Sequence, residues 1–191
     1  HVTDRRQRQM CIRDRANPCR ALFGPEPIPR SVVPIASFSD YNCPYCRVLS
    51  QILVEVDERH DGGTRIAWHE WPTLGSASHV MALAALAARR QGGYLRFHHS
   101  LMRTRFLPDA GYLTDLAIRK GLDPGQLHAD MRSPAVVWEI ARSTVLAESF
   151  GFRGTPALVV GRTAVSGAIT RAQLEQLIEV ERKAGPVPGC R

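Results

Sequence analysis

The stretch Ser39–Arg47 reads SDYNCPYCR and holds two cysteines, Cys43 and Cys46, two residues apart with a proline between them. An apolar run of strand length, SVVPIASF (31–38), precedes this stretch. The segment that follows, CRVLSQILVEVDERH (46–60), carries apolar residues at four-residue spacing, which is typical of an amphipathic helix. The sequence therefore predicts a strand, a turn and a helix, with Cys43 at the start of the helix.

The position of Cys43 favours redox chemistry. Unpaired backbone N–H groups and the positive end of the helix dipole favour a thiolate over a thiol. A thiol in this setting has a pKa of about 3.5–7.5 instead of about 8.5, and the thiolate is the nucleophile. We therefore expect Cys43 to be the nucleophile and Cys46, one turn further along, to be the resolving thiol. Pro44 fixes φ early in the helix without losing a needed hydrogen bond, and Tyr45 supplies no cation, so the helix end must stabilise the thiolate.

Two other interpretations of the cysteine pair stay open. A structural zinc site needs two more ligands, but the chain has no second C-x-x-C, and Cys19 and Cys190 lack the usual ligand spacing. An inert pair of core cysteines is the second alternative, although the start of a helix is a poor place to bury an unreactive thiol. Because chain ends often lie close together, Cys19 and Cys190 are candidates for a second disulfide, which the sequence alone does not establish.

The order of predicted elements indicates an α/β domain with a helical insertion. A second strand, TRIAWHEWP (64–72), follows the first helix, and residues 76–151 change to helical character. Two short strands follow within residues 157–167, and a last amphipathic helix begins with a capping box formed by Thr170 and Gln173.

The tripeptide Gly154-Thr155-Pro156 lies directly before the third strand. A proline at this position can simply mark the boundary of an edge strand. The functional interpretation is a cis Thr155–Pro156 bond that faces the cysteine pair. The backbone beside it would then be free to pair with an extended peptide.

Length and composition exclude several classes. The 191 residues fit one domain, and the contents of 44% hydrophobic and 23% charged residues are ordinary for a globular protein. No apolar run reaches the length of about 18 residues that spans a membrane, so we expect no stable membrane insertion. The net charge is +7, but residues 1–30 hold seven arginines and only three acidic residues, and no basic stripe is interleaved with aromatics. We therefore expect no nucleic-acid partner.

The N-terminal region is unusual. Residues 1–15 include RQRQMCIRDR, which resembles translated adaptor sequence, so we interpret them as a non-native or disordered segment together with Cys11. They lack the apolar core of a secretory signal, and the native N-terminus is not established. Residues 16–30 carry four prolines and are predicted to be an irregular lead-in.

These features together resemble the DsbA-like branch of the thioredoxin superfamily, the thiol:disulfide oxidoreductases of bacterial envelopes. The resemblance covers residues 31–182, and the segments that carry it occur in the family's order: SFSDYNCPYC, EWPTLG, ALAARRQGGYLRFHHSLM, FGFRGTPALVVG and GAITRAQLEQLI. Cys-Pro-Tyr-Cys also matches the glutaredoxin motif, but the length and the insertion argue against a small glutaredoxin. The resemblance implies a thioredoxin fold, a central mixed β-sheet flanked by helices, at residues 31–185, with a helical insertion at 76–151 and a tail at 186–191.

The resemblance also implies roles for individual residues. Cys43 would be the nucleophile, Cys46 the resolving thiol, and Thr155 would touch the substrate beside a cis Pro156. One position departs from the family pattern, because Ser37 stands where members commonly carry a buried acid that shuttles the resolving thiol's proton. Glu70 on the second strand is a candidate replacement, with an exposed strand-end acid as the alternative. We expect slower deprotonation of Cys46, not loss of function.

Adjacent histidines, His98 and His99, invite a metal interpretation. Neighbouring helical side chains point about 100° apart, which makes a shared ion difficult, so we interpret them as part of an ordinary insertion helix and expect no metal site.

The sequence thus predicts a thiol:disulfide oxidoreductase that acts on unfolded or partly folded exported proteins and needs no cofactor beyond the Cys43–Cys46 disulfide. A redox partner protein must reset the cysteines, and the resemblance implies a bacterial periplasm or cell envelope. Three alternatives remain: a disulfide isomerase or reductase of the same fold, a protein that holds Cu(I) between Cys43 and Cys46, and a non-catalytic peptide-binding module.

Overall fold

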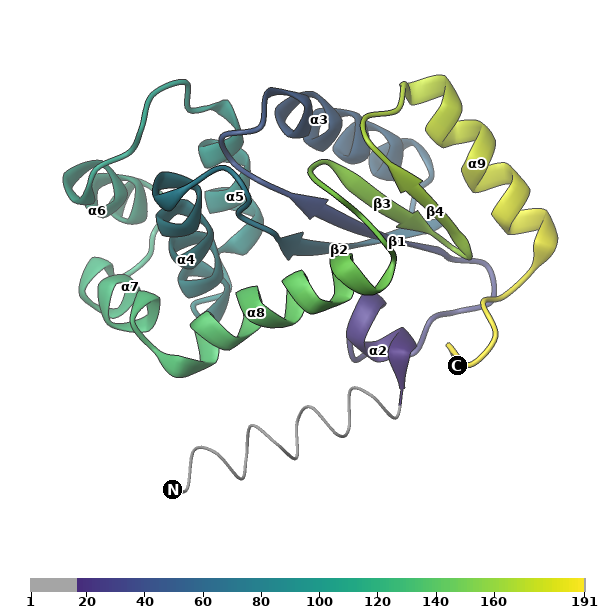
Figure 1. The fold of residues 1–191 in the computed structure, drawn as a ribbon, viewed down its shortest axis with the longest axis horizontal. Coiled ribbons are helices and arrows are strands. Elements are labelled where there is room, and N and C mark those ends of the chain that lie inside the picture. Colours follow the sequence, from purple (N-terminus) through teal and green to yellow (C-terminus); the bar gives the residue numbers. More distant parts are fainter. Residues whose placement is uncertain (1–16, 191) are drawn as a thin grey trace.

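The computed structural model describes residues 17–190, so the predicted non-native segment 1–15, with Cys11, lies outside the described residues. A four-stranded sheet with the order β2-β1-β3-β4 forms its centre (Figure 1). Strands β1 and β2 are parallel, and β3 runs antiparallel to both β1 and β4. The strands are β1 Val33–Ser39, β2 Thr64–Glu70, β3 Ala157–Val160 and β4 Thr163–Ser166. The predicted mixed sheet is confirmed.

Helices cover both faces of this sheet (Figure 1). The helices are α2 Pro18–Phe23, α3 Pro44–Arg59, α4 Ser76–Arg90, α5 Tyr94–Arg103, α6 Ala110–Arg119, α7 Pro124–Met131, α8 Pro134–Ser149 and α9 Arg171–Ala184. Side chains of β1 alternate between the two faces, as the pleat requires. Val33 and Ile35 pack with α3 and α9, whereas Ala36 and Phe38 pack with α2 and α8. Strand β1 is therefore buried along its whole length.

Helices α4 to α8 form the insertion, with α4 to α7 at one end of the sheet and α8 running back along one face of it (Figure 1). Three of them begin at side chains that accept a backbone hydrogen bond, namely Asp109, Asp123 and Ser133. The apolar core of the insertion, which includes Phe97 and Leu101, also contains Tyr41, Cys43 and Cys46. The cysteine pair therefore lies where the sheet and the insertion meet.

The lead-in at residues 16–30 is not wholly irregular, because it contains helix α2. Asn17 accepts a hydrogen bond from the backbone N–H of Arg20 and starts the helix, with Pro18 at its first position. Leu22 and Phe23 are buried against the sheet. A helix of six residues has little intrinsic stability, so packing against the sheet decides its formation.

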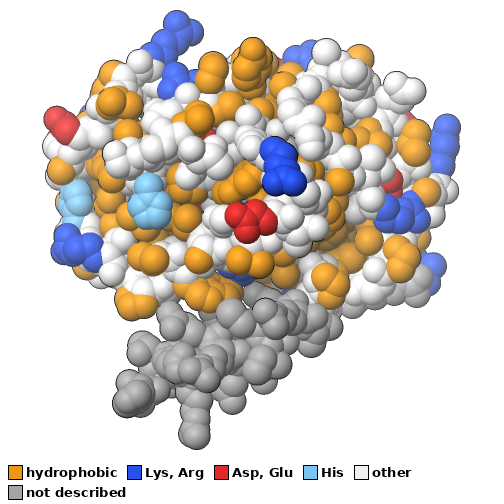
Figure 2. All heavy atoms as spheres, in the orientation of Figure 1, with side chains coloured by type: hydrophobic (Ala, Val, Ile, Leu, Met, Phe, Trp, Pro, Cys, Tyr) orange, Lys and Arg blue, Asp and Glu red, His pale blue; other side chains and the backbone are white. Residues whose placement is uncertain are grey.

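The charge on the surface and the hydropathy of the helices bear on possible nucleic-acid and membrane partners. On the face seen in Figure 2, Lys and Arg side chains are scattered among apolar and acidic ones and form no continuous basic patch. Within residues 17–190, no helix is both long and apolar enough to cross a membrane.

Candidate active site

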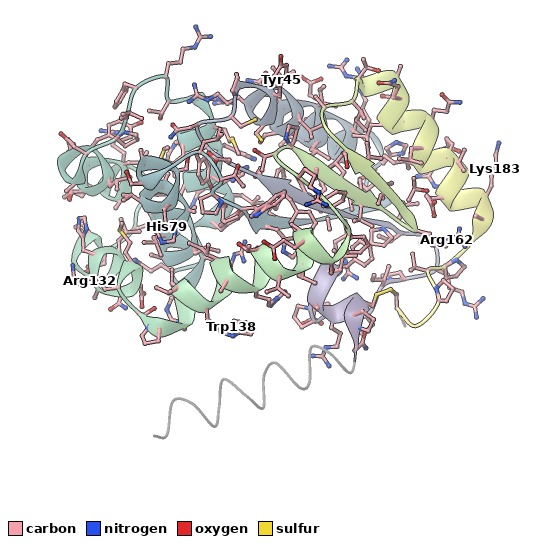
Figure 3. All side chains as sticks on the ribbon, in the orientation of Figure 1. Tyr45, His79, Arg132, Trp138, Arg162 and Lys183 are labelled. Carbon is pink, nitrogen blue, oxygen red and sulfur yellow. A yellow bond between two sulfur atoms is a disulfide. The ribbon has the colours of Figure 1, made fainter. Side chains whose placement is uncertain are left out.

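The two cysteines of the C-x-x-C motif lie at the start of α3. Cys43 is the N-cap residue, and its sulfur accepts a hydrogen bond from the backbone N–H of Cys46 at 3.3 Å. The sulfur of Cys46 in turn accepts from the backbone N–H of Asp40 at 3.5 Å. Both thiols are free and almost fully buried, with exposed fractions of 3% for Cys43 and 1% for Cys46. Tyr45, labelled in Figure 3, is exposed beside them.

This geometry separates the pKa values of the two thiols. The hydrogen bond from the Cys46 thiol is the main cause that lowers the pKa of Cys43 to about 6, although burial acts in the opposite direction. The same hydrogen bond, together with burial, raises the pKa of Cys46. At neutral pH, therefore, Cys43 is mainly a thiolate and Cys46 keeps its proton.

The start of β3 faces this pair. The sulfur of Cys43 lies 3.4 Å from the carbonyl oxygen of Thr155, and the Thr155–Pro156 peptide bond is cis. Thr155 is half-buried and Pro156 is buried. Residues 112 positions apart in the chain thus meet at one sulfur atom.

Asp40 holds the turn between β1 and α3, a role that the sequence analysis missed. Its buried carboxylate accepts four hydrogen bonds, from the backbone N–H groups of Asn42, Thr73 and Leu74 and from the hydroxyl of Ser78. These bonds join the turn to the loop that precedes α4. Because the turn is fixed, the N–H of Asp40 is held on the sulfur of Cys46.

A second buried polar cluster lies beside the pair and centres on Glu70. The Oε1 atom of Glu70 accepts hydrogen bonds from the hydroxyls of Tyr41 at 2.7 Å and Tyr94 at 2.6 Å. The Nδ1 atom of His98 lies 2.8 Å from the Tyr41 oxygen, and its Nε2 atom lies 3.3 Å from the hydroxyl of Ser50. Each tyrosine has one proton and gives it to Glu70, so Nδ1 of His98 must be the donor toward Tyr41.

Burial and the carboxylate of Glu70 keep both phenols in this cluster protonated. Burial is the main cause that raises the pKa of Tyr41 and Tyr94, and the negative charge of Glu70 raises both further. Tyr41 is part of the turn that carries Cys43, so the hydrogen bonds of its hydroxyl with Glu70 and His98 hold this turn in place.

Ser37 and Glu70 are the two positions that the sequence analysis discussed for the proton shuttle. Ser37 is buried on β1, between Trp68 of β2 and Leu158 of β3. Glu70 is 1% exposed, so the alternative of an exposed strand-end acid is wrong. No hydrogen bond joins Glu70 to Cys46 in the described part of the chain, and its role as a proton shuttle stays a prediction.

His98 is the other residue whose place was not foreseen. It is fully buried at the centre of the polar cluster, not on an ordinary helix face, whereas His99 is only half-buried. A signal for this was present, because Tyr94 and His98 are four residues apart and therefore share one face of α5. Within residues 17–190 no group of three or more His, Cys, Asp or Glu side chains could hold a metal ion.

Cys19 and Cys190 form a disulfide in the structure, with their Cα atoms 5.2 Å apart across 171 positions of sequence. The bond ties α2 to the C-terminal tail. It lies in the apolar core on the α2 and α8 side of the sheet, separate from the core that holds Cys43 and Cys46.

The profile of the DSBA-like thioredoxin domain family matches residues 34–179 of this chain. A thioredoxin-like oxidoreductase from Silicibacter pomeroyi DSS-3 is 38% identical, with a TM-score of 0.75, and the alignment covers 86% of this chain and 97% of that chain. A search of curated proteins finds no match to this sequence.

Two further structures share the fold at lower identity. The thiol-disulfide exchange protein alpha-DsbA2 from Wolbachia pipientis is 21% identical with a TM-score of 0.76, covering 94% of this chain and 98% of that chain. The catalytic domain of Proteus mirabilis ScsC is 23% identical with a TM-score of 0.73, covering 92% and 98%.

Proposed function

This chain belongs to the DSBA-like thioredoxin domain family and is a protein-disulfide oxidoreductase, and on this premise we propose that it oxidises exported proteins through Cys43 and Cys46. Members of the family use a redox-active cysteine pair without a cofactor. The observation that carries the proposal is the sulfur of Cys43 at the start of α3, 3.4 Å from the backbone of Thr155.

The exchange takes two steps from the oxidised form. A substrate thiolate attacks the sulfur of Cys43, forms a mixed disulfide and releases Cys46 as a thiolate that takes up a proton. A second substrate thiolate then attacks the substrate sulfur of the mixed disulfide, forms the substrate disulfide and releases Cys43 as a thiolate. Two electrons pass from the substrate dithiol to the enzyme, and a redox partner protein must accept them to restore the Cys43–Cys46 disulfide.

The low pKa of Cys43 supports the oxidising direction. At pH 7, a thiol with a pKa of about 6 stabilises the reduced form by about 1.4 kcal/mol relative to a thiol that stays protonated. For a two-electron couple this raises the reduction potential by about 30 mV, which makes the pair more oxidising. In the reduced enzyme, the hydrogen bond to Cys43 and burial raise the pKa of Cys46, so Cys46 keeps its proton there.

Thr155 and Pro156 are the proposed substrate-binding residues. The backbone of Thr155 lies beside the reacting sulfur, so a substrate chain attached to Cys43 must pass along it. Proteins commonly recognise an extended peptide through hydrogen bonds between the two main chains. We place the reaction in a bacterial periplasm or cell envelope, since one structure of similar fold, with a TM-score of 0.75 and 24% identity, is a periplasmic thioredoxin-like protein from Salmonella enterica serovar Typhimurium.

Trapping of mixed disulfides tests this function. Cys46→Ala removes the resolving thiol, so we expect covalent adducts with reduced, unfolded protein substrates to accumulate on Cys43 and to disappear on reduction. Cys43→Ala is the matched control and should give none. If Cys46→Ala never accumulates an adduct, the proposed mechanism is wrong.

The reduction potential separates oxidation from isomerisation or reduction. We expect a value near that of strong oxidants, about −120 mV, whereas a value of about −180 mV or lower would assign the pair to an isomerase or a reductase.

A further inference from the structure

A groove runs between α3 and α5 and starts beside the nucleophile. The two helices pack side by side (Figure 1). Between them lies a cavity of about 440 Å³, lined by Pro44, Arg47, Val48, Met102, Arg103 and Arg105. The lining residues of α3, with Gln51 added, occupy positions 44, 47, 48 and 51, the spacing of one helix face. This face begins at the residue bonded to Cys43.

A second cavity extends the groove away from the active site. It measures about 190 Å³ and shares Gln51, Met102 and Arg103 with the first cavity, so the two adjoin. Its far end reaches Val54 and Glu55. From Pro44 to Glu55 the groove spans three turns of α3, about 16 Å. That length accommodates about five residues of an extended chain.

The part of the groove next to Cys43 is positively charged and partly apolar. Arg47 donates both of its hydrogen bonds to the backbone carbonyl of Tyr41, and no carboxylate lines the first cavity. Arg103 and Arg105 are exposed and have no carboxylate partner within residues 17–190. Val48 is 57% exposed and Met102 is buried, so apolar surface lies between the arginines.

We propose that this groove docks an acidic, extended segment of the substrate protein whose cysteine reacts with Cys43. The proposal rests on the proposed function and adds a charge preference to it. Unpaired guanidinium groups favour carboxylates on the partner, and complementary charge raises the rate of encounter more than it raises the final affinity. The apolar surface of Val48 would bury alternate side chains of the same segment.

Matched dithiol peptides test the proposal. Two peptides share one pair of cysteines and one length, and carry either Asp and Glu or Lys and Arg beside the first cysteine. We measure the second-order rate constant of their oxidation by the oxidised full chain. We expect the acidic peptide to react at least about tenfold faster at low ionic strength, and this ratio to approach one in concentrated salt, because steering by charge is screened. Equal rates at low salt would overturn the proposal.

Charge reversal assigns the preference to the groove. Arg103→Glu combined with Arg105→Glu should invert the ratio, and the milder pair Arg103→Gln with Arg105→Gln should remove it. Arg96→Glu combined with Arg132→Glu is the control, because these exposed arginines lie outside both cavities, and Figure 3 shows Arg132 in the part of the insertion far from Tyr45. If this control also inverts or removes the ratio of the two rate constants, the charge preference does not come from the groove and the proposal is wrong.

The neutral dithiol dithiothreitol separates this proposal from the proposed function. If the oxidised wild-type protein oxidises it and shows no charge preference between the peptides, only the groove is wrong. If the oxidised wild-type protein oxidises none of the three dithiols, the function itself is wrong. Saturable self-association of the chain that is lost in the Arg103→Glu, Arg105→Glu variant would show that a second copy occupies the groove, and would also overturn the proposal.

Discussion

At the scale of single residues, two sulfur atoms with the same chemistry have opposite protonation. Cys43 caps α3 and receives hydrogen bonds, which lowers its pKa to about 6, whereas Cys46 donates and is buried, which raises its pKa. The turn around them is held by Asp40 and Tyr41, whose partners lie on other elements. The reactivity of Cys43 therefore depends on residues that do not react.

Replacing Tyr41 with Phe should weaken this support. Glu70 would lose one of the two hydroxyls that donate to Oε1, and its Oε2 already lacks a partner in the described part of the chain. We expect Tyr41→Phe to lower the free energy of unfolding by about 1–3 kcal/mol, measured by urea denaturation. Tyr112→Phe is the control, because in the described part of the chain its hydroxyl bonds to Thr104 alone, and it should cost less than Tyr41→Phe, about 0.5–1 kcal/mol. Equal costs for the two variants would contradict a special role for Tyr41.

The sequence located the proposed reacting residues, whereas it missed most of the residues that support them. Cys43, Cys46 and Thr155 could be proposed because a C-x-x-C at a helix start and a Gly-Thr-Pro before a strand are local signals. Asp40 could not, since its partners Thr73, Leu74 and Ser78 are 33 to 38 positions away in the chain. The spacing of Tyr94 and His98 indicates only a shared helix face, because the other partners of His98 are 48 and 57 positions away. A buried polar cluster is a property of packing, which a local pattern does not reveal.

At the scale of elements, His69 joins four of them. It lies on β2, donates from Nε2 to the carbonyl oxygen of Leu22 in α2 at 2.7 Å, and stacks on Phe38 of β1. Its Nδ1 lies 3.4 Å from the hydroxyl of Ser143 in α8. Burial, the main cause, lowers the pKa of His69 to about 4, so this histidine is neutral in the folded protein at neutral pH.

His69 should make stability depend on pH in a defined window. The folded pKa of about 4 lies below the unfolded value of about 6.5, so its contribution is complete above pH 6.5 and is lost as the pH falls through 4. We expect the free energy of unfolding to fall by about 2–3 kcal/mol more between pH 7 and pH 4.5 in the wild type than in His69→Gln. Urea denaturation at both pH values measures this difference. Identical pH dependence in the two proteins would show that His69 does not titrate in this way.

Element boundaries were predictable where capping residues mark them. Asp123 and Ser133 are each followed by a proline, a local pattern typical of a helix start, and they are the N-cap residues of α7 and α8. Helix α2 was not predicted, because it lies among prolines and is only six residues long. Its stability comes from the sheet beneath it and from the bond between Cys19 and Cys190, and neither is visible in the segment itself.

At the scale of the whole molecule, the two apolar cores on opposite faces of the sheet are covered by different elements. Helices α3 and α9 close one core, whereas α2, α8 and the C-terminal tail close the other. The disulfide between Cys19 and Cys190 fixes the second core, joining segments 171 positions apart. A crosslink over so long a loop restricts the unfolded chain strongly.

Removing this disulfide should destabilise the fold without affecting the reacting pair. We expect Cys19→Ala with Cys190→Ala to lower the free energy of unfolding by about 2–4 kcal/mol, measured from the urea midpoint. The rate at which Cys43 reacts with an alkylating agent should stay the same, because the bond lies in a different core. An unchanged urea midpoint would mean that the bond contributes no stability.

The central claim is that Cys43 is a thiolate at neutral pH while Cys46 keeps its proton. The most direct measurement is the ultraviolet absorbance of the thiolate in the reduced protein as a function of pH, with Cys43→Ser as the blank. The account predicts a single transition with a midpoint at about pH 6 that is absent from the blank. A midpoint near pH 8.5, the value of an unperturbed thiol, would contradict it.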